Sequence, residues 1–313
     1  MKNSNSNSYD DVFRTLITSS PEILIPFVNE MFKPNKKFSK YDKIQYNSGD
    51  LFIPNKKGKR HRITDSSFTI NSNNIDYHYH IEYQSRQDSS MIIRMYEYDS
   101  QLALRDGEIS NQTLTVRFPN SGILYLRSTQ AVPDTMTIKI ITPGGNTKYV
   151  VNILKLNDYN IDELFNKELY FLIPFILFNC ETQLKMYNED EVALKKFLND
   201  FENVIDRLRR CLTTGKIDDI TYRTIIETMY IVNTKITDNY KHVQKEVEEI
   251  MGGKEIELEV RKVYNEGYDN GYDKGQKEVL IKLVESGKIT KKEASEIKKT
   301  LTPESSWTSR RFK

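Results

Sequence analysis

The chain is poor in the residues that would cross-link it or hold it in a membrane. Its two cysteines, Cys180 and Cys211, lie far apart without a CxxC spacing, which argues against a zinc ribbon or a disulfide scaffold and fits a reducing compartment. The longest apolar run, residues 169–178, is much shorter than the roughly 20 residues that a membrane helix needs. Residues 1–8 are polar and lack the apolar core of a signal peptide, so we expect a disordered lead-in and a cytoplasmic protein without a membrane partner.

Several catalytic signatures are also missing. The sequence has no GxSxG elbow, no phosphate-binding P-loop, no GxGxxG after a strand and no HExxH zinc motif. Its 46 basic and 44 acidic residues leave a net charge of +2, so any nucleic-acid site must be a local patch. With 313 residues, 38% of them hydrophobic and 29% charged, the chain is long enough for a globular core and an extension.

Proline is absent between Pro174 and Pro303, which favours a helical carboxy-terminal half. Apolar residues recur there at three- and four-residue spacing, the pattern of amphipathic helices, over residues 192–212 and 220–236. A third helix is expected from about His242.

A glycine-spaced segment, residues 264–276, follows these helices. Gly267, Gly271 and Gly275 recur every four residues, so on a helix they form a narrow stripe. One interpretation is close helix–helix contact between the subunits of a homo-oligomer. The other is a flexible, frayed helix, since each interior glycine costs about 1 kcal/mol relative to alanine.

The amino-terminal half mixes helices and strands. Residues 9–33 predict a helix broken by a turn at 19–21, where Pro21 suits a helix start. Residues 88–106 also have a helical pattern. Strands are expected over 48–84, with turns at 54–55 and 71–74, and over 123–126, 135–142 and 148–156, with a hairpin turn at 143–145.

The most informative part of the sequence is Asp65 together with the strand 77–84, because two strands joined by a turn would bring Asp65 and Glu82 toward one place. Side chains alternate along a strand. One face therefore carries His78, His80, Glu82 and Gln84, and the other, which we expect to be the packing face, carries Tyr77, Tyr79, Ile81 and Tyr83. Two carboxylates and an amide in this arrangement can hold a divalent metal ion, which can activate water.

This pattern resembles the PD-(D/E)XK nuclease superfamily, and within it the recombination-promoting nuclease or putative transposase branch. The resemblance covers most of the chain. Five segments carry it in order: Asp10-Asp11-Val12-Phe13-Arg14, Ile81-Glu82-Tyr83-Gln84-Ser85, the helix-like 91–98 with Arg94 and Tyr98 four apart, 169–178 around Pro174, and the glycines of 264–276.

The resemblance implies a fold, a site and an activity. It implies an α/β protein in the α+β sense, with a restriction-endonuclease-like mixed sheet flanked by helices and a helical carboxy-terminal extension. Asp65 and Glu82 are then Mg²⁺ or Mn²⁺ ligands, helped by the backbone carbonyl of Tyr83. Gln84 stands at the last motif position, which is often Gln in this branch, and would orient the attacking water; unlike a lysine there, it carries no charge. The implied activity is metal-dependent cleavage of DNA, linked to recombination, mobile elements or phage defence.

Further residues are expected to assist. Asp10 on the first helix, and Arg94 with Tyr98 on one face of a later helix, are accessory candidates; Arg86 or Arg94 would supply the positive charge that Gln84 lacks. The densest basic run lies just before Asp65, and we expect its side chains to bind DNA phosphates. The predicted DNA-binding residues are Lys56, Lys57, Lys59, Arg60, Arg62 and Arg86.

The sequence also permits other sites and other functions. His78 and His80 share a face with Glu82, which permits a zinc site, although we expect them to line a cleft. The chain can instead be a nuclease-fold module that binds DNA or assembles without cutting. We divide it into a lead-in (1–8), a nuclease-like core (9–180), a helical extension (181–302) and a loose tail (303–313).

Overall fold

A computed structural model describes residues 7–47, 50–55, 58–63, 66–85, 90–129 and 131–253, and Thr290. Side chains are described in these ranges except at positions 7, 8, 10, 50–55 and 58–63. The predicted lead-in up to residue 6, the glycine-spaced segment and the tail lie outside them. Residues Met1–Gly253 form one compact unit and Lys254–Lys313 a second; all elements below belong to the first. Within the described ranges, no helix has both the length and the apolar character to cross a bilayer.

Two helices and a short turn begin the fold, as predicted. They are α1 (Asn7–Ser19), the 3-10 helix η1 (Pro21–Ile23) and α2 (Leu24–Phe32). Pro21 lies in the first turn of η1 and separates the helices, and α2 ends where Lys33 adopts the left-handed conformation with φ 44°.

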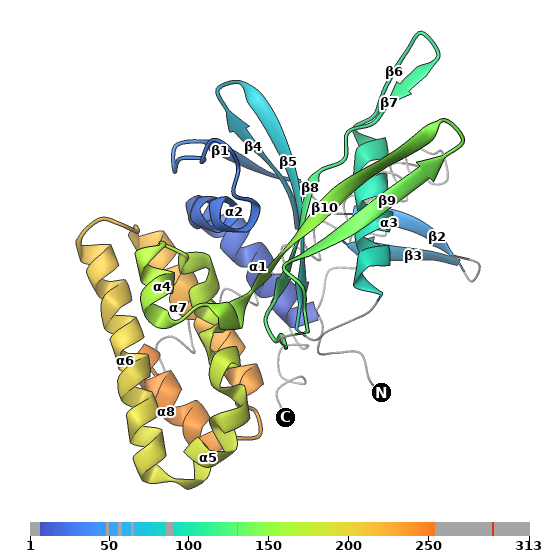
Figure 1. The fold of residues 1–313 in the computed structure, drawn as a ribbon. Coiled ribbons are helices and arrows are strands. Elements are labelled where there is room, and N and C mark those ends of the chain that lie inside the picture. The colour runs from blue at the N-terminus through green and yellow to red at the C-terminus, as the bar shows by residue number, and fades with distance from the viewer. Residues whose placement is uncertain are drawn as a thin grey trace. The chain divides into compact units, whose positions relative to one another are not determined.

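The centre of the molecule is a six-stranded mixed sheet (Figure 1). Its spatial order is β1-β4-β5-β8-β10-β9. The pairs β1–β4, β4–β5 and β10–β9 are antiparallel, whereas β5–β8 and β8–β10 are parallel. The strands are β1 (Lys43–Asn47), β4 (Ser66–Ser72), β5 (Ile75–Gln84), β8 (Asn120–Tyr125), β9 (Thr135–Thr142) and β10 (Gly145–Lys155). A mixed sheet flanked by helices is thus confirmed.

Two connections set the register around β5. Asn73 and Asn74 have φ of 52° and 63°, so a two-residue turn with both residues left-handed joins β4 to β5. The parallel partners β5 and β8 need a longer crossover, which includes helix α3 (Met91–Arg105). Both connections place Glu82 on a strand that is paired on each side.

Two small antiparallel sheets accompany the large one. The first pairs β2 (Asp50–Asn55) with β3 (Gly58–Ile63), within the predicted strand region. The second pairs β6 (Glu108–Ser110) with β7 (Thr113–Thr115). The β6–β7 hairpin was not predicted, because three-residue strands are too short to show an alternating pattern.

The remaining part of the unit is helical, and the predictions for 192–212, 220–236 and the helix from His242 are confirmed by α6 to α8. Asp190 and Asp218 cap the amino termini of α6 and α7 by accepting backbone hydrogen bonds. The helices are η2 (Leu156–Asp158), α4 (Ile161–Asn166), η3 (Tyr170–Gln183), α5 (Leu184–Glu189), α6 (Glu191–Thr213), α7 (Asp219–Ile236) and α8 (Lys241–Met251). Residues 180 and 181, the predicted boundary, both lie in η3.

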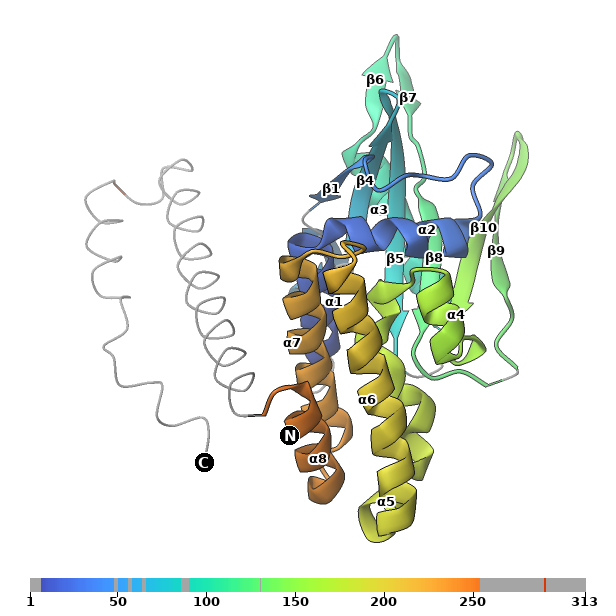
Figure 2. The same cartoon turned by 90° about the vertical axis from the view of Figure 1, so that its left-hand side faces the viewer.

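Helices cover the large sheet on both sides. Figures 1 and 2 show α1 and α2 on one side and α3 on the other. On the α3 side, Met91 and Met95 pack with Ile123, Tyr125 and Val151 of the central strands. The opposite side has an aromatic core in which α1, β5 and η3 meet, and α7 packs against both α1 and η3. Residues 79–83 of the central strand β5 are therefore buried on both faces.

Candidate functional site

Strand β5 alternates as the sequence predicts. Tyr79, Ile81 and Tyr83 point toward the side of α1 and α2, where the Tyr83 ring stacks on Phe13 with 3.4 Å between ring centroids. The predicted packing face is confirmed for these three residues.

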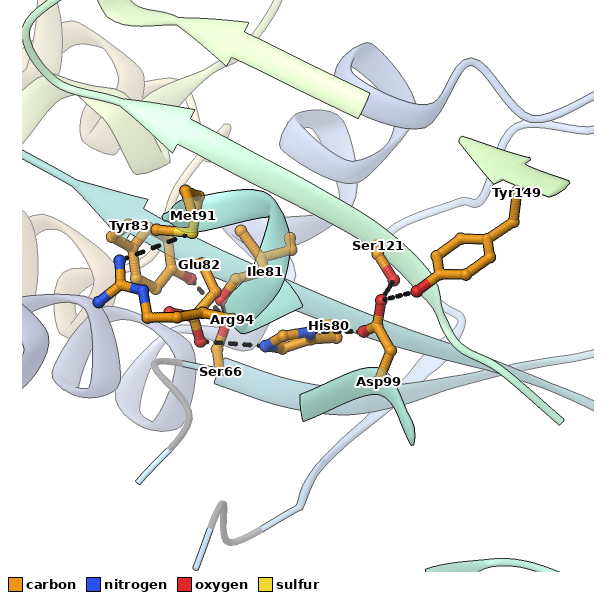
Figure 3. Close-up of polar contacts among 10 residues, drawn as sticks. All are labelled: Ser66, His80, Ile81, Glu82, Tyr83, Met91, Arg94, Asp99, Ser121 and Tyr149. Carbon is orange, nitrogen blue, oxygen red and sulfur yellow. Dashed lines mark hydrogen bonds and ion pairs between the residues drawn. The ribbon is translucent and has the colours of Figure 1, made fainter. Parts of the chain in front are cut away.

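His80 and Glu82 point to the other side of β5, beneath α3. His80 Nε2 lies 3.0 Å from Glu82 Oε1, and His80 Nδ1 lies 2.7 Å from Asp99 Oδ1 of α3 (Figure 3). All three side chains are buried, with exposed fractions of 0% for His80, 3% for Glu82 and 0% for Asp99. An imidazole thus bridges two carboxylates away from solvent.

Asp99 is itself held from two further strands. Its Oδ2 accepts hydrogen bonds from Ser121 Oγ of β8 at 2.8 Å and from Tyr149 Oη of β10 at 2.9 Å. Burial, followed by the charge of Asp99, raises the pKa of Tyr149, so its hydroxyl stays protonated and donates. The chain of contacts runs from Glu82 through His80 to Asp99 and then to Ser121 and Tyr149. We call these five residues the buried network.

The charge on His80 follows from its neighbours. Burial by itself would lower the pKa of His80, but hydrogen bonds and charge from Asp99 and Glu82 outweigh it and raise the pKa to about 10. The ring is therefore protonated at neutral pH and donates from both nitrogens.

This geometry corrects the expectation that His80 lines a cleft. It is fully buried because α3 covers this face of the sheet. Both of its nitrogens are bonded to carboxylates, which leaves neither for a zinc ion. His78 is not part of the network; its Nδ1 lies 3.1 Å from Thr69 Oγ1 of the neighbouring strand. The two histidines do not converge, so the zinc interpretation loses its basis.

Arg94 and Tyr98 occupy successive turns of α3, as predicted. Tyr98 is buried and packs edge-on against the His80 ring, with 5.8 Å between centroids and an interplanar angle of 77°. Arg94 Nη2 lies 3.6 Å from Met91 Sδ in the first turn of the helix. Tyr98 thus closes the network on the helix side.

The end of β5 lies beside the end of its parallel neighbour β8. The Gln84 carbonyl accepts a hydrogen bond of 2.8 Å from the Leu126 amide, and the Ser85 carbonyl accepts one of 2.9 Å from Arg127. Arg127 also forms an ion pair with Glu181 of η3. Carboxyl ends of parallel strands are common places for ligand sites in open α/β sheets. Glu82 and the half-buried Gln84 lie at this edge.

Several predicted site residues lie outside the described residues, or in segments of which only the backbone is described. Asp65, Lys56, Lys57 and Arg86 lie outside the described residues. For another four, only the backbone is described: Asp10 in α1, and Lys59, Arg60 and Arg62 in β3.

Strand pairing is described for the residues next to Glu82. Ser66, which follows Asp65 in the sequence, pairs with Ile81, which precedes Glu82. Ser66 Oγ is also 2.8 Å from Tyr83 Oη.

Sequence reasoning missed three members of the network: Asp99, Ser121 and Tyr149. They lie 19, 22 and 50 positions from the residues they contact. Asp99 carries the one available signal, because it follows Tyr98 on the helix that was expected to face the site. Nothing in the local sequence around Ser121 or Tyr149 predicts a contact with Asp99.

In comparisons with known proteins, no family model, curated protein or solved structure matches this chain. The resemblance to PD-(D/E)XK nucleases therefore depends on the motifs alone. Among the side chains that the structure describes, which exclude Asp65, no group of three or more His, Cys, Asp and Glu is arranged to hold a metal ion.

Proposed function

We propose that this protein is a metal-dependent DNA endonuclease of the PD-(D/E)XK type, with a restriction-endonuclease-like core. One observation carries the proposal: a carboxylate, Glu82, lies buried near the carboxyl end of a central strand and is held there by His80. The adjacent strand begins at Ser66, directly after Asp65, and the mixed sheet with flanking helices is the architecture that the motifs imply. The biological setting would be recombination, mobile elements or phage defence.

The donor set fits a hard divalent cation. Asp65, Glu82 and the Tyr83 carbonyl offer oxygen ligands, which suit Mg²⁺ or Mn²⁺. A carboxylate has about four lone-pair sites, so the hydrogen bond from His80 to Oε1 is compatible with metal ligation by Glu82. Carboxylates that bind metals are commonly hydrogen-bonded in this way.

The roles of the residues follow from their chemistry. Asp65 and Glu82 hold the cation, which when bound lowers the pKa of water and stabilises charge on the phosphate. Gln84 orients the attacking water through its amide, and Arg94 contributes positive charge from α3. The basic residues of 56–62, together with Arg86, bind the DNA backbone without reading its sequence.

A second candidate is a DNA-binding or assembly module that keeps the fold and does not cut. Two observations favour it: Glu82 is already paired with a protonated His80, and Gln84 brings no charge to the site. In this case DNA binding would be unaffected by Mg²⁺.

Cleavage of supercoiled plasmid distinguishes the two candidates. Wild type and Asp65→Ala are compared in Mg²⁺, Mn²⁺ and EDTA, with Asp106→Ala as a control, since Asp106 is exposed at the far end of α3. The nuclease proposal predicts metal-dependent nicking by wild type and the control, and none by Asp65→Ala. Wild-type protein that binds the plasmid but leaves it intact in every metal would support the binding module.

A further inference from the structure

We propose that Asp99 and His80 are positioning residues that fix the Glu82 carboxylate for metal binding, with Asp99 anchored by Ser121 and Tyr149. This inference rests on the proposed nuclease function. It assigns a role to residues outside the nuclease motifs, and it places the support for Glu82 on three other elements: α3, β8 and β10.

A metal ligand on a flexible side chain such as that of Glu82 has to be held in one orientation. A glutamate has three side-chain torsions, and a ligand oxygen must be held within about 0.5 Å of its productive position. His80, two residues earlier on the same face of β5, bonds to Oε1 at 3.0 Å. Its own ring orientation is fixed because its other nitrogen bonds to Asp99 at 2.7 Å. The His80 imidazole therefore ties the position of the Glu82 carboxylate to that of Asp99.

Asp99 is anchored through both of its carboxylate oxygens. One of its oxygens binds His80 and the other accepts from both Ser121 and Tyr149. Figure 3 shows these donors meeting the carboxylate on the side away from the imidazole. Asp99, His80 and Ser121 are at most 1% exposed, so water does not readily replace a lost partner. The position of Asp99 is thus set by side chains of three strands.

Stability alone does not require a buried polar network on this face of β5. Replacing buried ionic groups by well-packed apolar side chains of similar volume is often neutral or stabilising. The opposite face of the same strand is filled in that way, by stacked aromatic rings. A positioning role for Glu82 gives a reason for the polar groups on this face.

Asp99→Asn is the direct test. It keeps the shape of the side chain, but the amide has one acceptor oxygen where the carboxylate has two. Either the contact with His80 or the contacts with Ser121 and Tyr149 therefore lose their acceptor. Loss of an outer hydrogen-bond partner typically costs about 10- to 100-fold in metal affinity or activity. We expect the Mg²⁺ concentration for half-maximal cleavage to rise by about that factor, while KM for DNA stays within about twofold of wild type. Asp106→Asn, at the exposed carboxy-terminal cap of the same helix, is the matched control.

Tyr149→Phe is the milder variant, for the case that Asp99→Asn does not fold. It removes one donor to Asp99 and keeps the ring. We expect an intermediate rise in the Mg²⁺ requirement, smaller than that of Asp99→Asn. Tyr96→Phe is its control, because Tyr96 is an exposed tyrosine on α3 that stacks on Phe118. Thermal melting of all four variants separates misfolding from a change at the site.

Direct Mn²⁺ binding, measured by electron paramagnetic resonance, separates this inference from the proposed function. Suppose that wild type cleaves DNA and binds Mn²⁺, and that folded Asp99→Asn and Tyr149→Phe do so at the same rate and with the same affinity. The positioning role is then wrong, whereas the proposed nuclease function is retained. If wild type neither cleaves nor binds Mn²⁺, the proposed function fails and the positioning role fails with it. Weaker Mn²⁺ binding in both folded variants, with unchanged controls, is the result that we predict.

Discussion

Strand β5 has two faces that are buried to the same degree and filled with opposite chemistry. On one face Tyr83 stacks on Phe13, which stacks in turn on Phe175, with 3.4 and 4.3 Å between ring centroids. On the other, His80 bridges Glu82 and Asp99. Ile81 on the aromatic face and His80 on the polar face are both 0% exposed, so burial does not distinguish the faces. On the proposed function, the aromatic face supplies stability, whereas the polar face orients Glu82.

The largest loss of stability is expected from the aromatic face. Phe13→Ala removes the ring that lies between Tyr83 and Phe175 and should lower the free energy of unfolding by about 3–5 kcal/mol. Denaturant titration followed by circular dichroism measures this. Phe13→Leu, which keeps most of the volume, should cost clearly less, and equal costs for the two substitutions would argue against stacking as the source of stability.

The next largest loss of stability is expected where α2 packs closely on the same face of the sheet. A Cβ at Gly122 of β8 would lie 2.4 Å from Met31 Sδ and 3.0 Å from Phe32 Cζ. Gly122→Ala should therefore destabilise the protein by about 1–3 kcal/mol through overpacking. Gly144→Ala is the control, because a Cβ there meets nothing within 4 Å. Equal melting temperatures for the two variants would show that α2 shifts to make room for the added methyl group without a loss of stability.

A smaller loss of stability is expected from removing the Tyr83 hydroxyl, a polar group on the aromatic face. Tyr83→Phe keeps the stacked ring and removes the hydroxyl that contacts Ser66 Oγ at 2.8 Å. Ser66 retains its hydrogen bond to the Ile81 carbonyl, so the loss should be about 1 kcal/mol in denaturant titration. Tyr77→Phe, at the exposed end of the strand, should cost less. A loss as large as that of Phe13→Ala would mean that the hydroxyl, not the ring, matters most.

The smallest effect expected is on the chemical reactivity of a thiol in η3, with stability unchanged. Burial raises the pKa of Cys180 to about 12, above its ordinary value of 9.0, so the reactive thiolate is depleted at neutral pH. Three pH units correspond to a roughly thousandfold smaller thiolate fraction, so alkylation at pH 8 should be much slower than in denatured protein. Peptide mass spectrometry follows Cys180 separately from Cys211. Labelling of Cys180 in the native protein as fast as in the denatured protein would contradict the raised pKa.

Much of the fold could be predicted from the sequence, because its signals are local. The break at Pro21, the helices over 192–212 and 220–236 and the hairpin around 143–145 all follow from residues a few positions apart. Alternation along 77–84 predicted which side chains of β5 share a face. Strand β1 and the β6–β7 hairpin were missed, since neither has a clear apolar period.

The candidate site was only partly predictable. The sequence placed Glu82 and His80 on one face, but it did not reveal that α3 covers that face and brings in Asp99. Contacts such as that between Tyr149 and Asp99 depend on the order of the strands in the sheet, and local pattern does not determine that order. This is why His80 was expected in a cleft and instead lies in a buried network.

The most direct test of the division between the two faces is to measure cleavage and stability together for Glu82→Gln. This substitution keeps the shape of the side chain and leaves His80 bonded to Asp99. Metal-dependent plasmid cleavage should fall to background while the free energy of unfolding changes by less than about 2 kcal/mol, and Glu202→Gln, on the exposed side of α6, should match wild type in both. A folded Glu82→Gln protein that cleaves at the wild-type rate would contradict the role assigned to the polar face.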